Sequence, residues 1–187
     1  MIIDYGCRTV GVKVVFFGPA MSGKTTAIHW LFKSLGVEEV TSIENTIGRT
    51  LFMDFGVIPF SLGDSWTINA HVWSATGQDF YRSTREVVLV GADGIIFVAD
   101  AQEHLQEENV KSWQELVSTM AENKELLPLV VFLNKTDLMD IVTEEDLRSH
   151  LRIPTSIPIF KGIARDGHNA IETFQWLFQT AMKANFT

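Results

Sequence analysis

The octapeptide Gly18–Thr25 (GPAMSGKT) constrains this chain more than any other feature of its sequence. It satisfies the pattern G-x-x-x-x-G-K-S/T at every defined position. The apolar run Val10–Phe17 before it predicts a buried strand, and a helix is predicted from Lys24 to about Leu35, ended by Gly36. Glycines let backbone N–H groups of such a turn face one anion, and the helix N-terminus adds about half a positive charge. The segment therefore predicts a cradle for phosphate groups.

Two side chains of this loop have expected roles on a nucleotide. Lys24 reaches the β- and γ-phosphates, and the Thr25 hydroxyl ligates Mg²⁺. A chance glycine turn with a solvated lysine is the alternative, and the predicted strand–loop–helix context argues against it. The residues expected to contact the nucleotide here are Gly18, Ala20, Met21, Ser22, Gly23, Lys24, Thr25 and Thr26.

A second tetrapeptide, Asn134-Lys135-Thr136-Asp137, directly follows the apolar run Leu129–Leu133 and fits N-K-x-D. The Asp137 carboxylate can accept two hydrogen bonds from guanine, whereas adenine offers no matching pair of donors. Asn134 is expected to brace the phosphate loop, and the stem of Lys135 to cover one face of the base. Asn and Asp also favour ordinary turns, but the position after a core strand favours guanine recognition.

Apolar strands and amphipathic helices alternate along the chain. This pattern predicts an α/β fold with a mostly parallel sheet covered on both faces, and ligands bound beyond the carboxyl ends of its strands. The hairpin made by the second and third strands provides one antiparallel edge. The expected strands are Val10–Phe17, Thr50–Phe60, Trp66–Trp73, Gly94–Ala99, Leu129–Leu133 and Ile157–Phe160; the further expected helices are Glu103–Asn123, a short one capped by Thr143, and Ala170–Lys183.

The overall composition narrows the class of protein further. The chain has 187 residues with 46% hydrophobic residues, which predicts one domain over residues 1–187. Its 15 Lys and Arg against 23 Asp and Glu give a net charge of −8, which disfavours nucleic-acid binding. Cys7 is the one cysteine, so no disulfide forms within the chain and the cytoplasm is the expected compartment. We expect no transmembrane segment and no direct membrane anchor.

The chain resembles the Ras superfamily of small GTPases over nearly its whole length. Trp73–Arg82 and Gly91–Asp100 are similar to Arf-like proteins and to prokaryotic cell-polarity GTPases of the MglA type, and Arg49–Phe55 is similar to the MglA type. The resemblance implies a P-loop NTPase fold, a small G-domain with a six-stranded sheet and five helices. It also implies a switch that binds GTP and GDP with Mg²⁺ and hydrolyses GTP. The implied roles are Gln78 to orient the attacking water, Gly77 to sense the γ-phosphate, Thr50 to close on Mg²⁺, Arg49 as an arginine finger in cis, and Ala164 to meet the guanine O6.

Several positions depart from the family pattern or leave alternatives open. Ser74 stands where the family motif D-x-x-G has its Asp. Asp54 in the neighbouring strand either supplies that carboxylate or faces solvent. Asp100 is interpreted as a loop or helix-capping residue. The remaining open points are Ala20 in place of a glycine, Thr46 competing with Thr50 for Mg²⁺, and Arg49 as a finger or as a solvated loop residue.

The switch interpretation predicts moving segments and protein partners. We expect Ile43–Thr50 and Thr76–Arg85 to move, and the resemblance implies effectors and regulators, among them small roadblock-type proteins. Two rival functions remain: a GTP-binding module without turnover, and a P-loop kinase, for which the Arg148–Arg152 region offers too few arginines. The aromatic residues Phe52, Phe55, Phe60 and Trp66 are interpreted as core rather than effector surface, and His29 and His71 as packing or surface residues.

Overall fold

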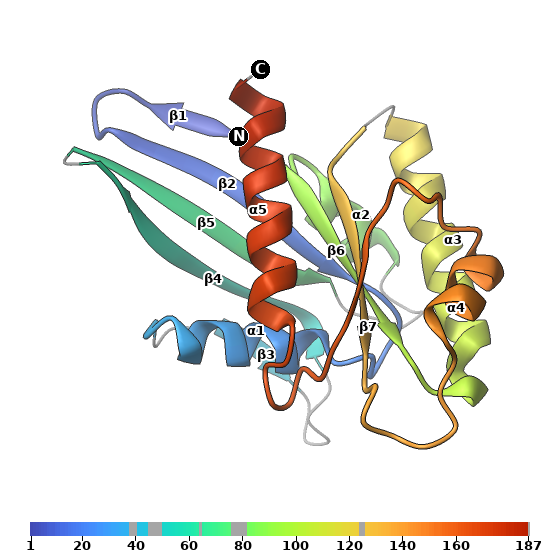
Figure 1. The fold of residues 1–187 in the computed structure, drawn as a ribbon. Helices are drawn as coiled ribbons and strands as arrows, with labels where there is room; N and C mark the ends of the chain where they lie inside the picture. Colours follow the sequence, from blue (N-terminus) through green and yellow to red (C-terminus); the bar gives the residue numbers. More distant parts are fainter. Residues whose placement is uncertain (38–40, 45–49, 64, 76–81, 124–125, 187) are drawn as a thin grey trace.

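One β-sheet runs through the centre of the structure (Figure 1). The computed structural model describes residues 1–37, 41–44, 50–63, 65–75, 82–123 and 126–186. Seven strands follow the order β3-β4-β5-β2-β6-β7-β8, and β1 pairs with β2 off this path. Their bounds are β1 Ile2–Asp4, β2 Thr9–Phe17, β3 Thr41–Glu44, β4 Thr50–Leu62, β5 Trp66–Ala75, β6 Gly94–Asp100, β7 Leu129–Asn134 and β8 Ile159–Lys161.

Five α-helices of the described residues cover the two faces of the sheet, as Figure 1 shows. Helices α1 and α5 lie on one face, and α2, α3 and α4 lie on the other. None of the helices in the described part of the chain has the length and apolar character that crossing a bilayer requires. The bounds are α1 Lys24–Ser34, α2 Arg82–Leu89, α3 Gln106–Asn123, α4 Glu144–Leu151 and α5 Ala170–Phe186, with a 3₁₀ turn at Glu103–Leu105 before α3.

The alternation of side chains along β2 builds both halves of the core. Val14 and Phe16 pack with the helices α1 and α5, whereas Val15 and Phe17 pack with α2, α3 and α4. A slip of one residue would exchange these two sets, so burial on both faces fixes the register of the strand. The end of β2, and with it the position of Gly18, is therefore set by the core.

For the described residues, the mostly parallel sheet, the antiparallel hairpin and the five helices that the resemblance implies are confirmed. β4 pairs antiparallel with β5, while β5, β6, β7 and β8 continue the parallel part around β2. The count of six strands is short by two, because β1 pairs antiparallel with the first residues of β2 and β3 pairs antiparallel with β4. Each of these strands has four residues or fewer, too short for a recognisable alternation of polar and apolar residues.

Three of the four hairpin aromatic residues are half-buried and pack on other rings. The ring centroids of Phe55 and Trp73 are 4.4 Å apart, and Phe55 also stacks on His71. The ring centroids of Phe60 and Phe178 of α5 are 5.3 Å apart. Trp66 contacts Tyr5 edge to face. The side chain of Phe52 is outside the described residues. The prediction of core packing thus holds most clearly for Phe60, which joins the α5 side of the core.

Candidate functional site

The phosphate loop connects β2 to α1 in a conformation that requires glycine at two positions. Gly18 has φ 146°, and a Cβ atom there would lie 2.3 Å from the carbonyl oxygen of Val98. Gly23 has φ 101°, and its Cβ would lie 2.2 Å from Nδ2 of Asn134. Both positions therefore combine a left-handed backbone with contacts that exclude a side chain. This is the tight strand–loop–helix turn that the sequence predicts.

Lys24 is buried at the start of α1, and its side chain folds back over the loop. Its Nζ donates hydrogen bonds to the carbonyl oxygens of Gly18 at 2.8 Å and Pro19 at 2.7 Å. Burial lowers the pKa of Lys24 to about 7, although the negative charge of Asp54 opposes the shift, and Arg85 lowers it further. An incoming anion would favour the charged form of this amine.

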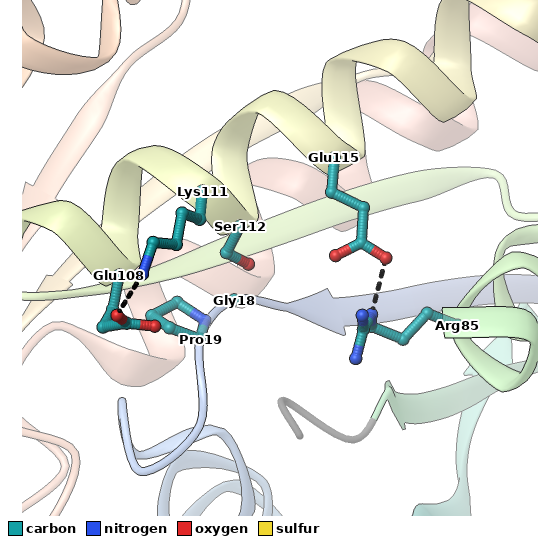
Figure 2. Close-up of a pocket in the computed structure, with 7 residues that line it drawn as sticks. All are labelled: Gly18, Pro19, Arg85, Glu108, Lys111, Ser112 and Glu115. Carbon is teal, nitrogen blue, oxygen red and sulfur yellow. Dashed lines mark hydrogen bonds and ion pairs between the residues drawn. The ribbon is translucent and has the colours of Figure 1, made fainter. Parts of the chain in front are cut away.

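A second cation, Arg85, lies near the same turn (Figure 2). Arg85 of α2 donates from Nε to Glu115 of α3 at 2.7 Å, and its side chain is 7% exposed. Arg85 and Glu115 line a small hollow together with Gly18 and Pro19 of the phosphate loop. The ion pair joins α2 to α3 directly beside the phosphate loop.

The side chain of Asn134 connects three segments that are far apart in the sequence. Its Nδ2 donates to the carbonyl oxygen of Ser22 at 2.7 Å, and its Oδ1 accepts from the backbone N–H of Ala164 at 2.8 Å. Asn134 is buried, so each of these bonds forms away from water. The bracing role expected for Asn134 is therefore supported by its bond to the phosphate loop. The same side chain also binds the loop that contains Ala164.

The rest of the Asn134–Asp137 segment is held by two further contacts. Thr136 donates from its backbone N–H and its hydroxyl to the carbonyl oxygen of Gly162. The Asp137 carboxylate accepts from Arg165 at 3.3 Å across an exposed ion pair. A Cβ at Gly162 would lie 2.3 Å from the Phe132 ring, which explains this glycine and which no motif in the sequence indicates.

Asp100 is the last residue of β6, so the interpretation of it as a loop residue is wrong. Its carboxylate accepts from the backbone N–H of Gln102, directly before the 3₁₀ turn, which is a capping type of contact. The buried Asp100 carboxylate pairs with Nζ of Lys135 at 2.5 Å. It lies beside Lys135 because Asp100 and Asn134 are register partners in the β6–β7 pair. Sequence reasoning missed this contact because strand register is not visible in one segment.

The metal side of the site has oxygen donors of the kind that Mg²⁺ prefers. The Thr25 hydroxyl donates to the Asp54 carboxylate at 2.6 Å. Asp54 is fully buried, so the alternative that it faces solvent is wrong. Within the described part of the chain, the hydroxyls of Ser22 and Ser74 are buried without a hydrogen-bond partner, and orphaned groups of this kind are ones that a ligand or water can satisfy. The described residues contain no cluster of three or more His, Cys, Asp or Glu that could bind a metal by itself. A hydroxyl and one nearby carboxylate fit an ion that keeps several waters and binds substrate phosphates.

The other predicted site residues are distributed over the described and undescribed parts of the chain. Ala20 and Met21 are exposed on the loop, and Thr26 is exposed on α1. Thr50 begins β4 opposite Glu44 of β3. Thr46, Arg49, Gly77 and Gln78 lie outside the described residues, and with them most of the two expected moving segments.

Comparison with known proteins identifies the family. A sequence profile described as the ADP-ribosylation factor family matches residues 4–181. The chain belongs to the ADP-ribosylation factor family. As members of the wider group of Arf, Rab and MglA-type small GTPases are GTP hydrolases, this Arf-family chain is a GTPase: it binds guanine nucleotide and acts as a switch toward regulator or effector proteins.

Individual relatives agree with this assignment. The chain is 34% identical over 183 residues to the mutual gliding-motility protein MglA of Myxococcus xanthus, covering 92% of this chain and 91% of the relative. It is 27% identical to the Ras-related protein RABG3c of Arabidopsis thaliana, covering 94% and 84%, and 24% identical to the human Ras-related protein Rab-7b, covering 94% and 84%. The resemblance stated from the motifs is thus confirmed.

Proposed function

We propose that this Arf-family chain binds GTP and GDP with Mg²⁺ at the site described above and hydrolyses GTP through residues of its two switch segments. The observation that carries the proposal is the double contact of Asn134. One amide joins the phosphate loop at Ser22 to the base-side loop at Ala164, so the two ends of one nucleotide are read by a single connected unit. A match to either motif alone would not link them.

At the phosphate end, Lys24 exchanges its bonds to the loop carbonyls for the β- and γ-phosphates. The charged amine is then favoured, because the phosphates offset the desolvation that lowers its pKa in the free protein. Backbone N–H groups of residues 20–26 surround the same phosphates at the start of α1.

At the metal end, Thr25 and Thr50 ligate Mg²⁺, which supplies positive charge to the β- and γ-phosphates when bound. Asp54 would supply, on the metal side of the site, the carboxylate that Ser74 lacks. The contact between Thr25 and Asp54 supports this arrangement, because the two residues already meet at 2.6 Å.

At the base end, Asp137 accepts from the guanine N1–H and amine, the stem of Lys135 covers the ring, and the N–H of Ala164 meets the guanine O6. Asp137 leaves its exposed pair with Arg165 at little cost, because such surface pairs contribute about 0–1 kcal/mol.

Hydrolysis adds water across the bond between the β- and γ-phosphates and releases GDP and phosphate. Gln78 orients the attacking water, Gly77 senses the γ-phosphate, and Lys24 offsets negative charge. Arg49 adds a second cation in cis, so a roadblock-type regulator or other partner needs only to order the switch segments. We place this activity in the cytoplasm.

The test uses the purified chain with GTP, GDP and ATP, with and without Mg²⁺. We expect tight GDP and GTP binding in calorimetry, weak ATP binding, and phosphate release that Gln78→Ala abolishes without loss of binding. Lys24→Ala should abolish binding itself. Tight GTP binding without phosphate release, even with a partner, would instead support a binding module, and preference for ATP would overturn the proposal.

A further inference from the structure

Helix α3 is hydrogen-bonded to the end of β6 through one buried side chain, Asn109. Its Oδ1 accepts from the backbone N–H of Asp100 at 2.9 Å, and its Nδ2 donates to the carbonyl oxygen of Asp100 at 2.8 Å. Asn109 is fully buried. Gln106, one turn earlier on α3, donates to the same carbonyl at 3.0 Å. The backbone of Asp100 is therefore held on both of its polar groups by a single amide of α3.

The Asp100 side chain in turn contacts Lys135, in the segment Asn134–Asp137 that is expected to bind the base. One carboxylate oxygen accepts from the backbone N–H and the side-chain amide of Gln102, each at 3.1 Å. The other oxygen pairs with Nζ of Lys135 at 2.5 Å. Lys135 has φ 66°, in the left-handed region, so its backbone direction is unusual for a lysine. The position of its ammonium is thus fixed at one end by Asp100 and at the other by a constrained backbone.

We propose that Asn109 is a positioning residue for the bound nucleotide: it fixes Asp100, which holds Lys135 against the guanine ring. The position of α3 then sets how long the nucleotide stays bound. This role rests on the proposed function, because it requires guanine beneath the stem of Lys135.

Asn109 has a simpler alternative role, which the experiment must separate. A buried amide with both groups satisfied also stabilises the junction of β6 and α3, since an unpaired backbone group there would cost free energy. A purely structural role predicts that loss of Asn109 lowers the stability of the protein, and that any change in nucleotide release is the same with and without the Lys135 side chain. A positioning role predicts that the effect on the nucleotide disappears when the Lys135 side chain is gone.

The experiment measures release of GDP carrying a fluorescent methylanthraniloyl group from the full chain. Asn109→Ala, which removes both bonds to the Asp100 backbone, and the same-sized Asn109→Asp, which removes the donated one, should each speed release about three- to tenfold. In a Lys135→Ala background, the same substitutions should change the release rate less than about twofold. Asp100→Asn should speed release as Asn109→Ala does, and the two should not add.

Thr119→Ala is the matched control, because Thr119 is a buried polar residue of the same helix whose hydroxyl donates within α3, to the carbonyl oxygen of Glu115. It should leave release unchanged at equal loss of stability. Unchanged release in both Asn109 variants, or equal acceleration with and without Lys135, would overturn the positioning role. If the unaltered chain bound no GDP, the proposed function would fail too; if it binds GDP and Lys24→Ala does not, only the role of Asn109 is at stake.

Discussion

Asp54 and Ser74 are register partners on the neighbouring strands β4 and β5, and both are fully buried. Ser74 occupies the position of the aspartate in the motif D-x-x-G, and Asp54 directly opposite accepts from the Thr25 hydroxyl through its carboxylate. Opposed residues of an antiparallel pair have Cβ atoms only about 4.5–5.5 Å apart. A carboxylate moved to the opposite strand therefore stays within reach of the same site.

Asp54→Asn should weaken Mg²⁺ binding about 10- to 100-fold, the usual effect of losing a residue that orients metal ligands. The measurement is the Mg²⁺ concentration that slows GDP release by half. Asn preserves the size and the acceptor for Thr25, so a fall in metal affinity reports the lost charge.

A double variant that moves the carboxylate from position 54 to position 74 provides the control for Asp54→Asn. Ser74→Asp added to Asp54→Asn should recover most of the Mg²⁺ affinity, because it returns a carboxylate across the strand pair. Asp166→Asn, an exposed carboxylate paired with Arg165, should have no effect. Unaltered Mg²⁺ affinity in Asp54→Asn would exclude the metal role.

Gly23→Ala should lower GDP affinity about 100-fold, because the added Cβ would meet Nδ2 of Asn134 at 2.2 Å and break its bond to Ser22. Gly36→Ala is the matched control: Gly36 also has a positive φ, 69°, but a Cβ there would have open space. It should cost about 1–2 kcal/mol of stability and leave binding intact. Titration calorimetry and thermal unfolding of both variants measure the two effects, and equal affinity in both would refute the assigned contact.

The lowered pKa of Lys24 predicts how stability depends on pH in the nucleotide-free protein. The pKa of Lys24 is about 7 in the folded protein, whereas the ordinary value for lysine, which applies to the unfolded chain, is 10.5. Between pH 7 and pH 10.5 the unfolded chain therefore binds more protons at this residue than the folded protein does. The free energy of unfolding therefore rises with pH across this range: the stability linked to Lys24 is fully present above pH 10.5 and is lost as the pH falls toward 7. Its slope is at most about 1.4 kcal/mol per pH unit.

Urea unfolding of the unaltered chain and of Lys24→Met from pH 7 to 9 tests this dependence. The unaltered chain should gain stability relative to Lys24→Met as pH rises. At pH 8, GDP binding should also take up protons, seen as a dependence of the binding heat on the buffer. Parallel stability curves would show that the Lys24 amine is not desolvated in the free protein.

Asp137→Ala should lower GDP affinity about 100-fold or more, because two hydrogen bonds from guanine to a charged acceptor are lost. Arg165→Ala should change affinity less than about fivefold, since its pair with Asp137 is exposed and weak. Competition between GDP and ADP measures the outcome: only Asp137→Ala should lose the preference for guanine. Retained preference in that variant would assign base recognition to other residues.

The local motifs predicted much of the site. Lys24 and Asp137 follow buried strands and Asn134 ends one, and these strands lie within one or two residues of the expected bounds. The short strands β1 and β3 escaped prediction because they contain too few residues for periodicity. The role of Asp100 escaped because its partner, Lys135, is 35 residues away and is reached only through the pairing of β6 with β7.

The sequence by itself determined the phosphate loop, the guanine-reading segment and the order of six strands and four helices, because each depends on residue types at short, fixed spacing. Only the tertiary structure decided that Asp54 faces Ser74 and that Asn109 holds Asp100 beside Lys135. Those contacts depend on which strands are neighbours and in what register they pair. Register is chosen by burial on both faces of the whole sheet, which no single segment of the chain contains.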